Sequence, residues 1–353
     1  MKNVRIILIA LSALALGVGS FAGCASKTDG ELEIVNVSYD PTRELYKAYN
    51  QLFSKHWLET RKQNVNVVQS HGGSGKQALE VANGLEADVV TLALEGDVDA
   101  VKNAGLIKEG YVKNFPLDSS PYTSTIVFLV RAGNPKNIQD WNDLVRDDVG
   151  VVTPNPKTSG GARWNYLAAW YYFEKQGQSE EQIIASIRKL FQNVVVLDSG
   201  ARGSTTSFVE NGQGDVLVAW ENEAFLSLKE YPGKYEIVVP SVSILCQPTV
   251  AVVDEVVDER KTREVATEYL NYLYSDDAQR LEAKWYYRPS NQKILAEFKN
   301  ATGSKTVKSL PEDGKWIVTE VELTDIQHFG GWTKALNRHF TNGALFDSIY
   351  EKK

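Results

Sequence analysis

Histidine, cysteine and clustered positive charge are all scarce in this chain of 353 residues. Its four histidines never occur in a pair with metal-ligand spacing such as i, i+4, so no metal centre is recognisable. The formal net charge is −7 and no basic run is present, which argues against nucleic-acid binding. After residue 23, no apolar stretch is long enough to cross a bilayer. With 43% hydrophobic and 24% charged residues, the chain has the composition of a folded protein with a sizeable core, and its length suggests two domains.

Two enzyme motifs are incomplete. The segment 70–77 is similar to a P-loop, but that motif requires a glycine where Ser70 stands and a serine or threonine where Gln77 stands. The sequence His71-Gly72-Gly73 would suit an oxyanion loop of an esterase, yet a Gly-x-Ser-x-Gly nucleophile motif occurs nowhere in the chain. We therefore expect a protein that is not an enzyme and that uses no metal or cofactor.

The N-terminal segment has the features of an export signal. Lys2 and Arg5 precede an apolar run at 6–18, and a short small-residue stretch then leads to Cys24. This end resembles a lipobox, apart from Phe21, which stands where a smaller aliphatic residue is usual. We predict that residues 1–23 are a lipoprotein signal peptide, that Cys24 is lipidated and that 24–30 form a polar tether; plain secretion is the alternative.

Cleavage after residue 23 changes the charge and the cysteine chemistry. It removes two positive charges and no negative ones, so the net charge of the mature chain is −9. An acidic protein of this kind must bind an anion through local donors rather than through its overall charge. Because Cys246 is the only other cysteine, a lipidated Cys24 leaves no disulfide within the chain.

Strand-like and helix-like segments alternate through the first part of the chain. Asp40-Pro41 begins one helical segment. Such alternation predicts a parallel sheet covered by helices. The predicted strands are 32–38, 65–69 and 87–93, and the predicted helices follow Pro41 and cover 78–83.

Two β-rich runs, 121–130 and 248–254, enclose a second α/β series. The first run suits either a central strand or a connection between two domains. We predict a discontinuous first lobe, 31–121 with 252–353, and a second lobe, 122–251. The chain would cross between them near 122–131 and 246–253.

Four turns carry hydrogen-bond donors. Ser159 stands at a helix N-cap position, followed by Gly160 and Gly161, so the helix start offers free N–H groups and a positive dipole end to a small anion. Similar turns lie at 70–77 and 197–205, and Trp220 ends a buried strand with an indole N–H that only donates. Ordinary helix caps and a core tryptophan are the alternative interpretation of these features.

Long motifs around these turns resemble the prokaryotic periplasmic sulfate-binding proteins of sulfate/thiosulfate ABC importers. The resemblance spans nearly the whole mature chain and includes Phe329-Gly-Gly-Trp332 near the C-terminus. It implies a two-lobed α/β clamp in which each lobe is a mostly parallel sheet flanked by helices, with two crossover strands between the lobes. The other matching segments are 36–45, 70–77, 154–165, 198–204 and 219–223.

In that family, uncharged donors hold sulfate in the cleft between the lobes. Transferred by motif, the donors here would be the N–H of Ser74, the hydroxyl of Ser159, the N–H groups of Gly160, Gly161 and Ala201, and the indole N–H of Trp220. Candidates for residues that support them from behind are Asp40, His71, Arg163 and Arg202.

The resemblance also implies the partners. We expect an exported, periplasmic or cell-surface monomer that delivers sulfate to permease subunits and touches the membrane only through a lipid on Cys24. Thiosulfate or another tetrahedral oxyanion is the alternative ligand, because thiosulfate is also a small dianion that accepts hydrogen bonds.

Overall fold

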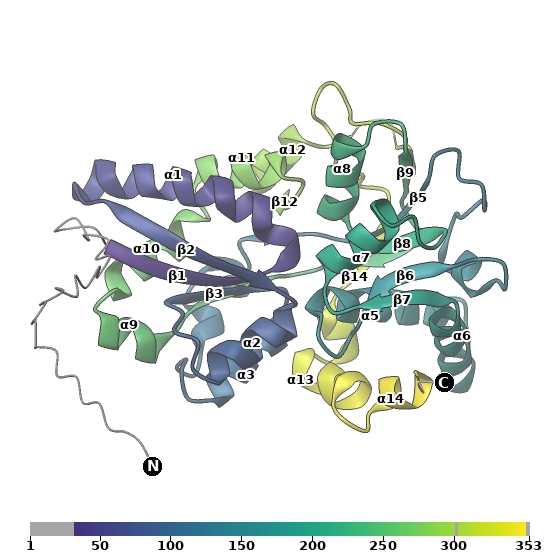
Figure 1. The fold of residues 1–353 in the computed structure, drawn as a ribbon, viewed down its shortest axis with the longest axis horizontal. Helices are drawn as coiled ribbons and strands as arrows, with labels where there is room; N and C mark the ends of the chain where they lie inside the picture. The colour runs from purple at the N-terminus through teal and green to yellow at the C-terminus, as the bar shows by residue number, and fades with distance from the viewer. Residues whose placement is uncertain (1–31, 301–302, 351–353) are drawn as a thin grey trace, which may run out of the picture.

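The fold is taken from a computed structural model that describes residues 32–300 and 303–350 (Figure 1). Two α/β lobes lie side by side, each with a central sheet and helices on its faces. The predicted signal peptide, Cys24 and the tether lie outside the described residues. The expected two-lobed architecture is confirmed.

The first lobe contains a four-stranded sheet in the order β11-β3-β1-β2. Strand β1 is parallel to β2 and β3, whereas β11 is antiparallel to β3. The strands are β1 (Leu32–Tyr39), β2 (Val65–Gly72), β3 (Val89–Leu92) and β11 (Thr249–Val252). The helices of this lobe are α1 (Arg43–Arg61), α2 (Ser74–Ala82), α3 (Glu95–Asn103), α9 (Asp254–Arg260), α10 (Arg263–Tyr272) and α11 (Asp276–Lys284).

Alternate residues of β1 supply the two cores of this lobe, because successive side chains of a strand point to opposite faces. Ile34 packs with the apolar side of α1, where Tyr49 and Phe53 are fully buried. Val37 packs on the other face with Val81 of α2. A short 3-10 turn at Asp40–Thr42 leads from β1 directly into α1.

The second lobe contains a six-stranded mixed sheet in the order β13-β9-β5-β8-β6-β7. Strand β6 is parallel to β7 and β8, and β5 is antiparallel to both β8 and β9. The strands are β5 (Ile126–Arg131), β6 (Val151–Pro154), β7 (Val194–Asp198), β8 (Val216–Trp220), β9 (Tyr235–Val238) and β13 (Thr306–Val307). Its main helices are α5 (Gly160–Lys175), α6 (Glu180–Gln192), α7 (Ala201–Val209) and α8 (Glu221–Glu230).

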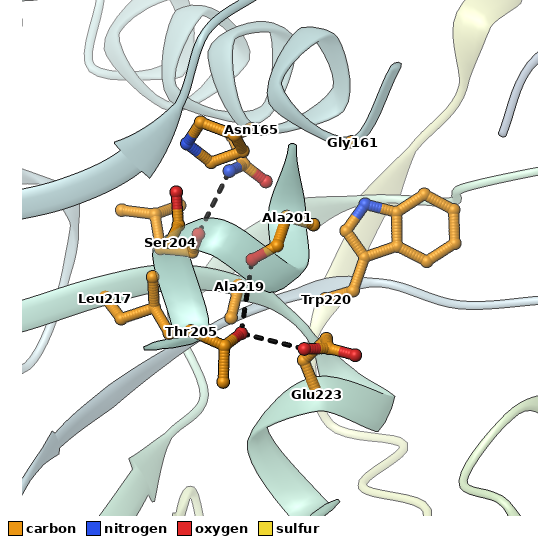
Figure 2. A pocket seen from close by; sticks show the side chains of 11 residues that line it. Gly161, Asn165, Ala201, Ser204, Thr205, Leu217, Ala219, Trp220 and Glu223 are labelled. Atoms are coloured by element: carbon orange, nitrogen blue, oxygen red, sulfur yellow. Dashed lines mark hydrogen bonds between the residues drawn. The ribbon is translucent and has the colours of Figure 1, made fainter. Parts of the chain in front are cut away.

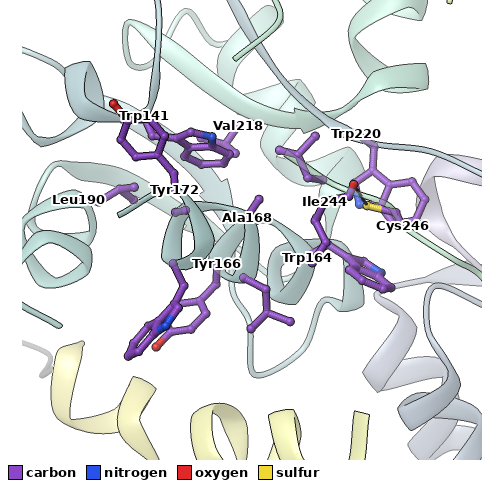
Figure 3. Packing of buried hydrophobic residues seen from close by; sticks show 14 of the residues in the cluster. Trp141, Trp164, Tyr166, Ala168, Tyr172, Leu190, Val218, Trp220, Ile244 and Cys246 are labelled. Atoms are coloured by element: carbon purple, nitrogen blue, oxygen red, sulfur yellow. Dashed lines mark hydrogen bonds between the residues drawn. The ribbon is translucent and has the colours of Figure 1, made fainter. Parts of the chain in front are cut away.

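Helix α5 is enclosed by protein, since 13 of its 16 residues are buried. A helix that is apolar on every side belongs in the interior rather than on a surface. Figure 3 shows aromatic side chains on several sides of α5, with Tyr166 directed toward the C-terminal helices. The rings of Trp164 and Trp332 pack edge-to-face with their centroids 4.6 Å apart, and the ring centroids of Tyr166 and Phe340 are 5.1 Å apart.

The C-terminal part of the chain corrects the predicted lobe boundary. Residues 252–353 were expected in the first lobe, but β13 pairs with β9, and β14 (Glu322–Thr324) pairs with β10 (Val242–Ile244). Helix α14 (Leu345–Ile349) packs on α6. The described residues from 303 onward therefore belong mainly to the second lobe, because their aromatic side chains cover the outer side of α5.

Three chain segments connect the lobes. In the first, β4 (Tyr122–Thr123) precedes β5, so 121–130 contains both a connection and a central strand. The second runs through Cys246, which exchanges two backbone hydrogen bonds of 2.9 and 3.0 Å with Ser124. The third contains β12 (Arg288–Pro289), which pairs with β4. The remaining short helices are α4 (Pro116–Ser119), α12 (Gln292–Glu297) and α13 (Trp332–Ala335).

A buried ion pair fixes the third connection to the second lobe. Arg288 donates to both carboxylate oxygens of Glu221 at 2.7 and 2.8 Å and to the carbonyl of Val318 at 3.0 Å. The Arg288 and Glu221 side chains are only 7% and 1% exposed. Because both charges are desolvated, each depends on the other for compensation.

We predict that Glu221→Gln lowers the free energy of unfolding by about 3–5 kcal/mol, because it leaves a buried guanidinium without a counter-charge. Urea denaturation followed by circular dichroism measures the change. The matched control is Glu297→Gln, which breaks the exposed pair with Arg280 at 3.0 Å and should cost less than about 1 kcal/mol. Equal losses in the two variants would contradict this account of the connection.

Candidate functional site

The predicted donors meet in the cleft between the lobes. A small pocket there is lined from the first lobe by the start of α2 and the turn after β1, and from the second lobe by the starts of α5 and α7. The carboxyl ends of parallel strands lie at one edge of a sheet, so the turns that follow them gather at that edge. The residues that line the pocket are Tyr39, Asp40, Pro41, Gly72, Gly73, Ser74, Ser159, Gly161 and Ala201.

Ser74 is the first residue of α2 and lines the pocket. Its hydroxyl is already engaged, since Oγ donates to Asp97 Oδ2 at 2.6 Å and accepts from the Ala93 N–H at 3.0 Å. The preceding residue, Gly73, makes no side-chain cap. The N–H of Ser74 is one of the four amides that a helix start leaves without an intrahelical partner.

The start of α5 offers three donors. Ser159 is the N-cap, and its Oγ accepts from the Ala162 N–H at 3.3 Å, which leaves its own O–H available to donate. Gly160 and Gly161 follow as the first two helical residues, whose N–H groups have no intrahelical partner. A Cβ on Gly161 would lie 3.0 Å from Trp220 Nε1, so a side chain there would crowd the indole.

Ala201 and Trp220 complete the second-lobe wall. Ala201 begins α7 after Gly200, where a Cβ would lie 2.3 Å from Asp40 Oδ2 of the other lobe. Trp220 is 1% exposed, and its Nε1 has no hydrogen-bond partner among the described residues. Figure 2 shows this nitrogen facing the space between Gly161 and Ala201. A buried indole N–H normally finds an acceptor, so this one points to a ligand.

Each of the two arginines near the donors pairs with a carboxylate of the first lobe, and Arg202 also pairs with Glu223 of the second lobe. Arg163 pairs with Asp97 and also donates to the Pro156 carbonyl at 2.9 Å. Arg202 makes two bonds to Glu44, at 2.9 and 2.8 Å, and one to Glu223 at 2.9 Å. These contacts join the lobes and leave uncharged groups as the donors that face the pocket.

Burial shifts the pKa values of two titratable groups near the pocket, Asp40 and His71. Burial raises the pKa of Asp40, although Arg43 and Arg202 oppose the rise. Burial and the nearby Arg43 lower the pKa of His71 to about 4, so its imidazole is neutral at pH 7. The Nδ1 atom of His71 has no partner among the described residues.

Four of the six predicted donors, Ser74, Ser159, Gly161 and Ala201, therefore line one pocket, together with the predicted supporting residue Asp40. Gly160 lies between two of these donors in the chain, and Trp220 Nε1 lies beside Gly161. The predicted supporting residues His71, Arg163 and Arg202 are not part of the lining.

Sequence analysis missed Glu44 and Asp97, whose carboxylates form ion pairs with Arg202 and Arg163. Asp97 lies in the first turn of α3, where an acidic residue is ordinary at a positive helix end, so the sequence carried only a weak signal for it. No group of three potential metal-ligating side chains occurs in 32–300 and 303–350, and no helix within these ranges has the length and apolarity of a membrane span.

Comparison with known proteins agrees with this geometry. The family model for bacterial extracellular solute-binding proteins matches residues 35–288. The chain belongs to this family. A sulfate-binding protein of Escherichia coli strain K12 is 53% identical over 91% of this chain and 94% of its own length. A thiosulfate-binding protein of Pseudomonas aeruginosa is 43% identical over 98% of both chains.

A solved structure extends the agreement to the fold. The sulfate-binding protein SubI from Mycobacterium tuberculosis H37Rv superposes with a TM-score of 0.75 at 29% identity, covering 88% of this chain and 99% of that one. The predicted resemblance to the sulfate-binding branch of extracellular solute-binding proteins is confirmed.

The lobes of this solute-binding protein are in close contact across the cleft. A Cβ on Gly73 would lie 2.8 Å from the carbonyl oxygens of Thr158 and Ser199, both in the second lobe. Trp164 Nε1 donates to the Ala93 carbonyl at 2.9 Å, and Asn222 Nδ2 donates to the Pro41 carbonyl at 3.0 Å. The structure thus has the two lobes closed on the pocket.

Proposed function

We propose that this chain captures sulfate for an ABC importer and delivers it unchanged to permease subunits. The observation that carries the proposal is the buried, unpartnered Nε1–H of Trp220 beside three helix N-termini from two lobes. The proposed sulfate donors are the N–H groups of Ser74, Gly160, Gly161 and Ala201, the hydroxyl of Ser159 and the indole N–H of Trp220. Asp40, His71, Arg163 and Arg202 support these donors from behind.

The donors proposed for this pocket suit a fully deprotonated anion. Sulfate carries no proton at neutral pH, so each of its oxygens accepts. Hydrogen phosphate keeps one proton that needs an acceptor, and a buried mismatch of this kind costs roughly 1–3 kcal/mol. Thiosulfate is the second candidate ligand, supported by the 43% identical thiosulfate-binding relative.

Closure of the lobes is the proposed signal to the transporter. An anion held between Ser74 of one lobe and the second-lobe donors stabilises the closed state, which the permease recognises. The interlobe ion pairs Arg163–Asp97 and Arg202–Glu44 also stabilise the closed state. We propose that the protein works as a monomer.

We predict that sulfate raises the unfolding temperature of the desalted mature chain and that phosphate at equal concentration does not. A ligand at about 1,000 times its dissociation constant adds about 4 kcal/mol of stability. Thermal unfolding with sulfate, thiosulfate, molybdate and phosphate ranks the ligands. No shift with any of these anions would overturn the proposal.

We predict that Trp220→Phe weakens sulfate binding. Loss of one hydrogen bond to a charged ligand should cost about 1.5–3 kcal/mol, which is at least about tenfold in the dissociation constant for sulfate. Isothermal calorimetry measures the change. Trp57→Phe is the matched control, because Trp57 Nε1 is also buried without a partner but belongs to α1, away from the pocket. Equal affinities in the two variants would exclude Trp220 from the site.

We predict that Gly73→Ala weakens sulfate binding by blocking closure. The backbone of Gly73 has φ −60°, which alanine adopts freely, so the only strain comes from the second-lobe carbonyls 2.8 Å away. Overpacking of this kind costs roughly 1–3 kcal/mol, or about fivefold to 150-fold in affinity.

X-ray scattering with saturating sulfate should show a less compact particle for Gly73→Ala than for the wild type. Gly72→Ala is the control, because its new Cβ meets only the flexible Gln77 side chain, at 3.1–3.3 Å. A Gly73→Ala protein that binds and compacts like the wild type would contradict the proposed closure.

We further propose that the exported chain is anchored at Cys24, which gives it a periplasmic or cell-surface location. Mass spectrometry of the N-terminal peptide from a membrane fraction should show a diacylglyceryl-modified Cys24. An unmodified N-terminus in the soluble fraction would favour plain secretion instead.

A further inference from the structure

A second recess lies behind the donor groups, within the second lobe. It is bounded by α5, α7, β8 and the start of α8, and Figure 2 shows its lining side chains. It shares Gly161, Ala201 and Trp220 with the proposed anion site, and the rest of its wall comes from the second lobe alone. Its volume is about 10 Å³, close to the minimum that one water molecule requires.

Besides Trp220 Nε1, two buried polar atoms of residues that line this recess have no protein partner among the described residues. They are Asn165 Oδ1 and Ser204 Oγ, on side chains that are 5% and 0% exposed. Burying such groups without a hydrogen bond is unfavourable, so each requires a partner.

The orientation of the Asn165 amide is fixed by its neighbours. Its Nδ2 donates to the carbonyl of Val218 at 3.0 Å and to Thr153 Oγ1 at 3.0 Å. A carbonyl only accepts, so the nitrogen must face Val218 and the oxygen must face the recess. The recess therefore offers an acceptor from α5 and a hydroxyl from α7.

The chemistry of this lining selects a small neutral molecule. An anion in the recess would be repelled by the Asn165 amide oxygen and by the Glu223 carboxylate, which also lines the recess. A metal ion would find the Asn165 amide oxygen, the Ser204 hydroxyl and a Glu223 carboxylate that already accepts from Arg202 and Thr205. The other lining residues, such as Leu217 and Ala219, are largely apolar. Water alone can both donate to Asn165 Oδ1 and accept from Ser204 Oγ in a space of this size.

We propose that this recess is a binding site for a single water molecule that bridges Asn165 Oδ1 and Ser204 Oγ. The bridge ties α5 to α7, the two helices whose first N–H groups face the anion pocket. Asn165 and Ser204 are thus positioning residues that hold the Gly161 and Ala201 amides at a fixed separation. The water is present both with and without anion, because its partners belong to one lobe.

A high-resolution crystal structure of the mature chain, determined with and without sulfate, tests the site directly. We expect one ordered water within about 2.5–3.2 Å of both Asn165 Oδ1 and Ser204 Oγ in each state. Clear density for the two side chains with no water between them would overturn the proposal. So would a thiosulfate complex whose terminal sulfur occupies the recess, since the space would then belong to the ligand.

A solution measurement with Ser204→Val tests the bridge independently. The added methyl groups fill the recess, so water-oxygen magnetic relaxation should report one fewer long-lived water than in the wild type. Ser207→Val is the matched control on the same helix, because the Ser207 hydroxyl donates to Asp198 at 3.2 Å and leaves the recess unchanged. An equal number of long-lived waters in the two variants would contradict the proposal.

The positioning role predicts that Ser204→Val also weakens sulfate binding several-fold, whereas Ser207→Val does not. This affinity prediction rests on the proposed function, and isothermal calorimetry measures the affinities. If the wild type binds no sulfate, the proposed function fails while the water measurements still decide the site. If Ser204→Val loses the water and keeps wild-type affinity, the positioning role is wrong.

Discussion

Buried hydrogen-bond donors without acceptors are the constraint on which this structure depends. Helices α2, α5 and α7 begin with N–H groups that the helix itself cannot satisfy, and Trp220 adds an indole N–H from the end of β8. Each of these segments follows the carboxyl end of a strand, which brings the donors to one edge of each sheet. Closure of the lobes then removes water from all of them together. Only an acceptor-rich ligand can replace that water without loss.

The charges around the donors are arranged so that they do not compete for that ligand. Arg163 and Arg202 lie close to the pocket, yet each is held by a carboxylate from the opposite lobe. A free guanidinium would bind any anion, including a protonated one, because a point charge does not discriminate between protonation states. Paired arginines contribute to closure and leave selectivity to the neutral donors. Local neutral donors of this kind are also compatible with the proposed anion site in a chain whose net charge is −7.

The donor turns were predictable from sequence because they are local. Serine and glycine after a β-branched run predict an exposed helix start whether or not the rest of the fold is known, and parallel strands predict that such starts gather. The partners of the arginines were not predictable, because Glu44 and Asp97 lie 158 and 66 residues away from them. The sequence did not predict the third connection, which contains Arg288, for the same reason. Nor did it predict that β13 and β14 lie in the second lobe. Pairing between distant segments depends on register and shape, which hydrophobic spacing does not encode.

The C-terminal segment shows how packing remote from the pocket serves the pocket. Helix α5 carries three of the six proposed donors at its first turn, so any tilt of this helix would move all three at once. A sheet covers only one side of a helix, and the aromatic residues Trp332, Phe340 and Phe346 cover much of the rest. Because interiors pack as densely as crystals, a helix enclosed in this way resists displacement far better than one lying on a surface. Packing around α5 therefore holds three proposed donors together in the second lobe, and Ser74 is the proposed donor that the first lobe adds.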